Sequence, residues 1–259
     1  MSALTDLRDN LVADLVNITD AAYPGDPAGT PANEAYFVAN VHNFLKALGQ
    51  AMLPGRKFIV SPKYAGLGNP FYTTIALAFA AVTGSSSSNK QLIFVEPSPT
   101  SYSDPLVIDS SQWVEFSGAG KYTSVISGAV AISNGVSIFR GIGFQSDISI
   151  NGGVAIFEDC TQPTGVFNLN GGSVIISNCS SWGFITSLNN GSLLFLEGVK
   201  SVKKGTGGDL ANSVTLNAGI TTGTYVFNDV RLEGAINNPS SVTIEESNVK
   251  TDATARPSY

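Results

Sequence analysis

A short pattern that is repeated four times between Gly135 and Lys200 constrains the fold of this chain more than any other stretch. Each copy consists of a glycine, a run of mostly apolar residues and a short polar turn, and the copies span residues 135–142, 153–160, 172–179 and 191–199. Successive first glycines are 18, 19 and 19 residues apart. A fixed period of about 20 residues is typical of a solenoid, in which each unit buries its apolar side chains only against its neighbours.

The residue types within each copy indicate a short β-strand followed by turns. The apolar runs are rich in Val, Ile and Phe, which favour strands. At least one asparagine stands within two residues before each first glycine, and Asn and Gly together favour tight turns. Less regular copies of the pattern follow at 213–216, 225–230 and 242–249. The sequence therefore predicts a mainly β solenoid of about seven to nine coils.

The residues that precede the repeat carry a resemblance to a known architecture. They comprise a strand at 56–62, a Gly-rich turn, a helix at 71–82 that contains Tyr-Thr-Thr-Ile-Ala-Leu-Ala, the strand Ile-Phe-Val-Glu-Pro, the segment Leu-Val-Ile-Asp and the segment Val-Glu-Phe-Ser-Gly-Ala-Gly. This order resembles the opening of right-handed parallel β-helix proteins of the pectate-lyase-like superfamily, which includes pectin esterases and many phage tailspikes. The resemblance covers about residues 58–249. It implies that the helix caps the N-terminal end of the coil and that Gly-Ala-Gly closes an early rung.

Four segments follow from these patterns. They are an N-terminal helical region at 1–55, the first strand and capping helix at 56–104, the parallel β-helix at 105–250 and a C-terminal tail at 251–259. In the first segment, leucines recur at helical spacing from Leu4 to Leu15, and a second helical pattern runs over 32–52. Two amphipathic helices cannot bury their apolar sides alone, so we expect this region to dock on the coil or on another chain.

Stacking the repeats aligns their side chains into columns. The sequence places Phe139, Phe157, Ile176, Phe195, Phe227 and Ile244 in one column, and Ile138, Ile156, Ile175, Leu194 and Val226 in the next. Successive residues of a strand point to opposite faces, so one column should fill the coil and the other should face outward, unless a turn lets both point inward. The sequence does not decide which column faces outward.

An outward apolar stripe on a soluble protein is normally covered by another subunit. We therefore expect an oligomer interface along the second column, formed by Ile138, Ile156, Ile175, Leu194 and Val226. Side-by-side coils favour a homotrimer, with a dimer as the alternative.

The charge of the chain argues against nucleic-acid binding. Its 259 residues include only 14 Lys and Arg, and the net charge is −6. A nucleic-acid groove needs clustered basic residues to neutralise phosphates. No P-loop, dinucleotide fingerprint or metal-ligand spacing appears, so no cofactor and no metal site are expected. The first residues lack the features of a signal peptide, and no apolar stretch is long enough to cross a bilayer.

Candidate catalytic groups do not converge in the predicted coil. Arg140 and Glu158 occupy aligned positions in adjacent rungs, which predicts an ion pair. Glu158 and Asp159 are adjacent and point to opposite faces, so they do not form the carboxylate pair of a glycosidase. His42, the single histidine, is expected on the surface of the second helix. Short polar residues that close turns form another column, which contains Asp159, Asn178, Asp229 and Asn248.

These observations favour a non-enzymatic structural protein of a virion. The charge-poor coil and the outward apolar stripe favour a phage tail fibre, a spike or a capsid-decoration protein, attached to other virion proteins through residues 1–55 and made in the host cytoplasm. The sequence does not distinguish head from tail. One alternative is a tailspike-like protein that binds or degrades host surface polysaccharide, and another is a bacterial β-helix protein for adhesion or scaffolding. In the tailspike-like protein, the candidate aromatic residues for stacking on sugar rings are Trp113, Trp182 and Tyr225.

Cys160 and Cys179 occupy the same place in adjacent rungs. Parallel strands lie about 4.8 Å apart, so a disulfide between them is geometrically allowed. We expect instead a reduced pair, buried in a stack of small apolar residues.

Overall fold

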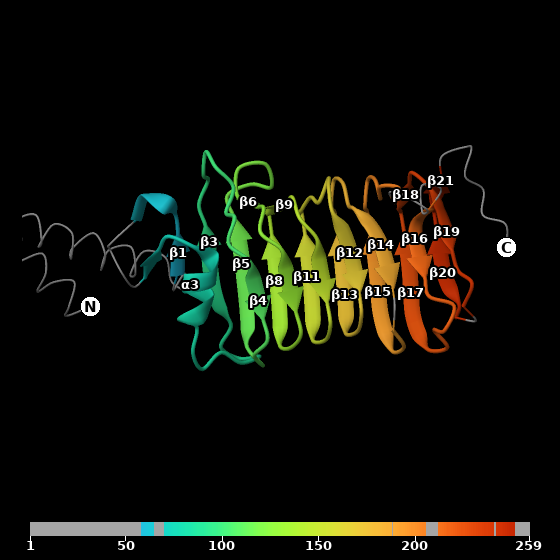
Figure 1. The fold of residues 1–259 in the computed structure, drawn as a ribbon, viewed down its shortest axis with the longest axis horizontal. Coiled ribbons are helices and arrows are strands. Elements are labelled where there is room, and N and C mark those ends of the chain that lie inside the picture. The colour runs from blue at the N-terminus through green and yellow to red at the C-terminus, as the bar shows by residue number, and fades with distance from the viewer. Residues whose placement is uncertain (1–57, 65–69, 188, 206–211, 241, 252–259) are drawn as a thin grey trace, which may run out of the picture. The chain divides into compact units, whose positions relative to one another are not determined.

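The computed structural model describes residues 58–64, 70–187, 189–205, 212–240 and 242–251. These residues form a parallel β-helix of about eight turns, which confirms the fold that the repeat predicts (Figure 1). The two helices expected within residues 1–55, with His42, lie outside the described residues, as do residues 252–259 of the expected tail.

Two long sheets form two sides of the coil. The ten-stranded sheet consists, in spatial order, of β2 (Phe71–Tyr72), β1 (Phe58–Val60), β3 (Gln91–Val95), β5 (Trp113–Gly118), β8 (Val136–Arg140), β11 (Val154–Glu158), β13 (Ser173–Ser177), β15 (Ser192–Glu197), β17 (Gly223–Asn228) and β20 (Ile244–Ser247). The seven-stranded sheet consists of β19 (Ala235–Asn237), β16 (Asn212–Leu216), β14 (Phe184–Ser187), β12 (Val166–Leu169), β10 (Ile148–Ile150), β7 (Val130–Ile132) and β4 (Leu106–Ile108).

The third side is made of shorter elements. The pairs are β6 (Val125–Ile126) with β9 (Gly143–Phe144), and β18 (Arg231–Leu232) with β21 (Lys250–Thr251). Single β-bridges join several other rungs on this side. All ladders between the named strands are parallel, so each rung lies directly over the next. Two helical segments precede β3, namely η1 (Pro62–Tyr64) and α3 (Ile75–Ala80).

A column of large apolar side chains fills the interior behind the ten-stranded sheet. Phe116, Phe139 and Phe157 are register partners across β5, β8 and β11. Their ring centroids are 4.7 and 5.1 Å apart, with an interplanar angle of 8° in both pairs. Because parallel strands are about 4.8 Å apart, flat rings in the same register position can stack in contact. The column continues through the fully buried residues Ile176, Leu196 and Phe227.

The helix that caps the first end of the coil is shorter than expected. The sequence predicts a helix over 71–82, whereas the first two of these residues form β2 and the helix α3 begins later. Thr74 is its N-cap, and the Thr74 Oγ1 accepts a hydrogen bond from the Leu77 N–H at 3.2 Å. The ring of Phe79 lies 6.2 Å from that of Phe116, so α3 covers the end of the apolar interior.

A left-handed turn follows each of the central strands of the ten-stranded sheet. Glycines occupy this turn after β8 and β15, where Gly141 and Gly198 both have φ of 61°. The other positions are Asp159 (φ 50°), Asn178 (55°), Asp229 (52°) and Asn248 (54°). Asn and Asp tolerate positive φ better than other side chains because they bond to nearby backbone. This polar column is therefore a ladder of turns.

Two glycines that begin the repeat are required by close contact between rungs. Gly153 and Gly172 have φ of 72° and 79°. A Cβ atom at Gly153 would lie 2.7 Å from the carbonyl oxygen of Gly135, and a Cβ atom at Gly172 would lie 2.6 Å from that of Gly153. Any other residue would combine a strained backbone with a clash, which explains the glycine at these positions.

Cys160 and Cys179 are both free thiols with no exposed surface. Burial raises the pKa of the Cys179 thiol to about 12 and raises that of Cys160 further. The structure therefore places two reduced cysteines in the interior, as the sequence predicts.

Candidate functional site

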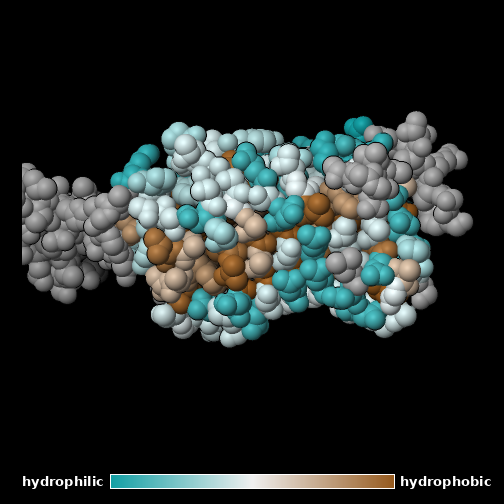
Figure 2. Space-filling view, viewed as in Figure 1, coloured by the Kyte–Doolittle hydropathy of each residue, from teal (hydrophilic) through white to brown (hydrophobic). Residues whose placement is uncertain are grey.

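The outer face of the ten-stranded sheet carries a continuous group of apolar side chains, here named the apolar band. It consists of two adjacent outward columns, with Ile138, Ile156, Ile175, Phe195 and Val226 in the first and Trp113, Val136, Val154 and Leu193 in the second. Ser173 interrupts the second column between Val154 and Leu193. Ile138 is only 6% exposed, and the other side chains are partly exposed. Figure 2 shows apolar residues gathered in a band along the length of the coil.

Strand alternation explains why this band faces outward. Phe157 and Ile176 are register partners and both are fully buried in the core column. Ile156 and Ile175 immediately precede them, are also register partners, and are partly exposed. Because neighbouring side chains of a strand point to opposite faces, the outward column adds nothing to the filling of the coil. Its apolar character is therefore available for contact with another surface.

The expectation that Leu194 belongs to the outward column is wrong. Leu194 is fully buried, and Phe195 is the register partner of Ile175. The reason is one additional residue between the first glycine and the strand of the fourth copy. Gly172 and Gly191 are 19 residues apart, but Ser173 pairs with Leu193, which is 20 residues later. Aligning the copies on their glycines therefore shifts β15 by one residue and exchanges its two faces.

Charged residues limit the apolar band at both ends and along one edge. Glu115 precedes Ile138 in the first column, and Glu245 follows Val226. Along the edge, Arg140 forms ion pairs with Glu115, at 3.2 Å between Nε and Oε1, and with Glu158. The ion pair of Arg140 and Glu158 across rungs, predicted from the sequence, is thus present. The three side chains are partly exposed, so these pairs add little stability.

Two of the three aromatic residues proposed for glycan stacking lie in the core. Trp182 is fully buried, and its ring centroid lies 5.1 Å from that of Phe157. Tyr225 is fully buried as well, and its hydroxyl group shares a hydrogen bond of 2.9 Å with the Ser187 hydroxyl. Both side chains point into the interior of the coil, so they cannot stack on a sugar. Only Trp113 is partly exposed, at one end of the apolar band.

Four described carboxylates, those of Glu115, Glu158, Asp159 and Glu233, form ion pairs with a lysine or an arginine. Asp159 Oδ1 lies 2.5 Å from Lys121 Nζ, and this hydrogen bond raises the pKa of the lysine. Glu233 Oε1 lies 2.6 Å from Lys203 Nζ. Burial alone would raise the pKa of Glu233, but hydrogen bonds from Lys203 and Ser201 outweigh it and lower the pKa. Across the described ranges, no group of three or more His, Cys, Asp or Glu residues could hold a metal ion.

Sequence reasoning missed part of the apolar band. Leu193 and Phe195 belong to it, and the second column with Val136 and Val154 was not recognised. The turn residues carry the signal that would have found them. Counting two residues back from the turn residues Gly141, Asp159, Asn178, Gly198 and Asp229 gives Phe139, Phe157, Ile176, Leu196 and Phe227, which is the observed core column. The last turn, at Asn248, gives the exposed Glu246 instead.

The fold and this surface together define a parallel β-helix protein with an apolar outer face. Comparison of the chain with protein-family models, with curated proteins and with solved structures finds no match. Of the resemblance noted for residues 58–249, the structure confirms the parallel β-helix fold. In the part of the chain that the structure describes, no helix has the length and apolar character needed to cross a bilayer.

Proposed function

We propose that this chain is a non-enzymatic structural protein of a virion, a trimeric tail fibre, spike or capsid-decoration protein. The observation that carries the proposal is the apolar band. Soluble monomers rarely expose a continuous apolar surface of this kind, and such surfaces normally mark an interface with another protein. Another copy of the same chain is a natural partner, because its own apolar band has the same length and rung spacing.

A cyclic trimer makes use of both columns of the band. Three parallel coils around one axis place the column that contains Ile156 against the column that contains Val154 in the next copy. In the proposed trimer this heterologous contact is repeated three times around the axis and covers both columns. The rungs from β8 to β17 then lie at the same height in every copy, and the charged residues Glu115 and Glu245 mark the two ends of the contact.

The virion role rests on further features of the chain. A rigid coil that is poor in charged residues, with 13% DEKR, suits a projecting structural module. In this proposal residues 1–55 attach the coil to a capsid or tail protein, and the assembled protein is located in the virion.

Co-purification tests the virion role. The chain should be found by mass spectrometry in purified particles of the virus that encodes it, in a constant ratio to the capsid protein. A variant without residues 1–55 should remain folded and oligomeric but should not enter particles. Absence of the full chain from particles would contradict the proposal, and entry of the truncated chain would contradict the attachment role of residues 1–55.

A further inference from the structure

Three positively charged residues lie beside one another on the third side of the coil. They are Lys200, Arg231 and Lys250, here named the cation ladder, and all three are exposed. Arg231 and Lys250 are register partners in the ladder of β18 and β21. The Arg231 N–H donates a hydrogen bond of 3.1 Å to the carbonyl oxygen of Val199, which places Arg231 beside Lys200. Because parallel strands lie about 4.8 Å apart, the three side chains leave adjacent rungs at close spacing.

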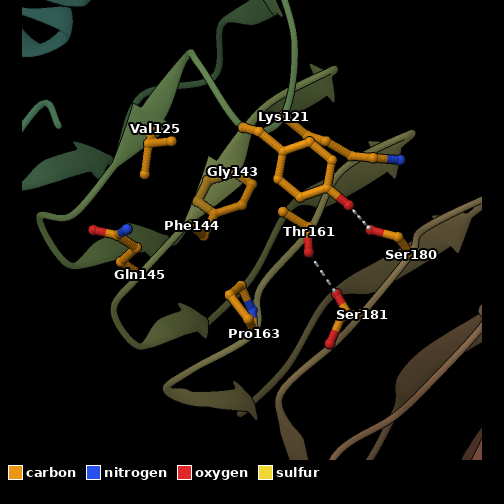
Figure 3. Close-up of a pocket in the computed structure, with 10 residues that line it drawn as sticks. Lys121, Val125, Gly143, Phe144, Gln145, Thr161, Pro163, Ser180 and Ser181 are labelled. Atoms are coloured by element: carbon orange, nitrogen blue, oxygen red, sulfur yellow. Dashed lines mark hydrogen bonds between the residues drawn. The ribbon is translucent and has the colours of Figure 1, made fainter. Parts of the chain in front are cut away.

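The earlier rungs of the same column carry neutral residues. Val125 pairs with Gly143, Gly143 pairs with Thr161, and backbone hydrogen bonds continue the column to Ser180. Figure 3 shows these four residues on successive rungs. Tyr122, which is 73% exposed, contacts this part of the column, with its hydroxyl group 3.4 Å from the Ser180 Oγ. Positive charge in the column is thus confined to the three adjacent rungs that follow.

The cation ladder lines a hollow of about 600 Å³. The left-handed turns after the strands of the ten-stranded sheet line it as well, through Asn178, Gly198, Asp229 and Asn248. The charged groups among the described residues of this lining are the three cations and the Asp229 carboxylate, which gives a formal charge of +2. The chain as a whole carries a net charge of −6, so the hollow is a local reversal of sign. Residues of the apolar band do not line it.

Two carboxylates near the cation ladder share their oxygens with other donors. Asp229 Oδ1 accepts a hydrogen bond of 2.7 Å from Asn248. Glu233, whose charge interacts with Arg231, accepts hydrogen bonds of 2.6 Å from Lys203 and from Ser201 at its Oε1. Like charges on adjacent strands destabilise a ladder, and these two carboxylates offset three stacked cations only in part. An anion bound in the hollow would offset the remainder.

We propose that the cation ladder binds phosphate groups, carried either by a free oligophosphate or by a lipid headgroup. The planar guanidinium of Arg231 can donate two parallel hydrogen bonds to a phosphate, and the ammonium groups of Lys200 and Lys250 act as point charges on either side. Phosphate concentrates its negative charge on oxygens of one small group, which suits cations on adjacent rungs. A carboxylate carries a single charge, so an acidic peptide would need several separately placed side chains. The hollow lies outside the apolar band, so the proposal does not depend on self-association.

The test is isothermal titration calorimetry of the full chain with sodium tripolyphosphate, without divalent cations and at low salt. Tripolyphosphate should bind with a submillimolar Kd, and at ten times this Kd it should raise the Tm by about 3–5 °C over sodium chloride of the same ionic strength. Arg231→Gln should weaken binding at least tenfold, and Lys200→Gln or Lys250→Gln at least threefold. Lys90→Gln removes an exposed charge outside the hollow and should leave the Kd within twofold.

Flotation with phosphatidylcholine vesicles, with and without phosphatidic acid, distinguishes the two sources of phosphate. Binding to the phosphatidic acid vesicles that Arg231→Gln abolishes would assign the lipid headgroup, and binding of tripolyphosphate alone would assign the free anion. Three results would overturn the proposal. They are no binding of either probe, binding that survives Arg231→Gln or falls equally in Lys90→Gln, and tighter binding of a hexaglutamate peptide than of tripolyphosphate. Circular dichroism confirms that each variant is folded.

Discussion

Phe195 lies beside Ile175 across the parallel ladder between β13 and β15, and both side chains face outward. Leu194 and Leu196, the neighbours of Phe195 in the chain, are fully buried. A shift of one residue in this strand would exchange the faces, placing a large aromatic ring in the core and a leucine outside. The register of β15 therefore decides which side chains the apolar band presents to a partner.

Charge substitutions at these two neighbouring positions should have opposite results. Leu194→Asp buries an unpaired carboxylate, which costs several kcal/mol, a large part of the 5–15 kcal/mol that typically stabilises a domain. Phe195→Asp places the charge on the outer face and should leave the coil folded. Far-UV circular dichroism and thermal unfolding distinguish the two variants. If Phe195→Asp unfolds the chain as completely as Leu194→Asp, the assigned register is wrong.

Truncation within the phenylalanine stack should be far more damaging than truncation in the apolar band. Phe157→Ala removes a fully buried ring that contacts Phe139 and Trp182, and it should lower the free energy of unfolding by about 3–5 kcal/mol. Ile156→Ala, at the adjacent outward position, should cost clearly less. Denaturant unfolding at matched protein concentration provides the comparison. Equal losses would show that both side chains belong to the core.

Much of the fold follows from the repeat, because a period near 20 residues with short apolar runs and Gly or Asn turns leaves few alternatives to a coil of parallel strands. Which column faces the interior and which faces outward is harder to predict, because both columns are apolar. Two observations settle which column faces the interior, namely the register of each ladder and the burial of Phe157 and its register partners. Counting two residues back from the left-handed turns at Asp159, Asn178, Gly198 and Asp229 gives the core column, whereas counting from the first glycine of each copy does not.

The aromatic residues illustrate a second limit of prediction from sequence, which is the exposure of a single side chain. Trp182 and Tyr225 are large and lie near polar residues in the sequence, yet both fill the interior. Tyr122 lies in the segment Gly-Lys-Tyr-Thr-Ser, which has no counterpart in the other rungs. A single aromatic residue in a polar loop is a signal for exposure. Its hydroxyl contact with Ser180 depends on two rungs that are 58 residues apart, which no local pattern shows.

The left-handed turn at Asn178 predicts an unusual order of stability among variants at this position. Its φ of 55° suits glycine and asparagine but not a β-branched residue. Asn178→Gly should change the free energy of unfolding by only a few tenths of a kcal/mol, whereas Asn178→Val should lower it by about 1–2 kcal/mol. Urea unfolding of both variants checks this order. A valine variant as stable as the glycine variant would contradict the turn geometry.

Glu233 should contribute to the acid sensitivity of the fold. Its pKa in the folded protein lies below the ordinary value of 4.5, because hydrogen bonds from Lys203 and Ser201 outweigh its burial. The charged form is therefore favoured by folding, so its contribution is present above pH 4.5 and is lost as the pH falls through the lowered pKa. Glu233→Gln should lose stability relative to the wild type at neutral pH, and this difference should shrink on acidification. Glu245→Gln, at an exposed position, is the control.

Both cysteines should be unreactive in the folded protein. Burial raises the pKa of both thiols, to about 12 for Cys179, so neither forms much thiolate at pH 8. An alkylating reagent should modify no cysteine of the native chain and two cysteines in denaturant without reductant. Mass spectrometry counts the modifications. Failure to modify the denatured chain before reduction would indicate a disulfide between Cys160 and Cys179.

The apolar band as a self-association surface is tested most directly by sedimentation equilibrium of the full chain and of the Ile156→Glu, Ile175→Glu double variant. The wild type should have three times the protomer mass of 26.9 kDa, and the double variant should have the mass of one protomer while keeping the circular dichroism spectrum of the wild type. A wild type of twice the protomer mass would retain the interface but exclude the trimer. A wild type that is monomeric at all concentrations, or a folded double variant that keeps the wild-type mass, would contradict the role of the band.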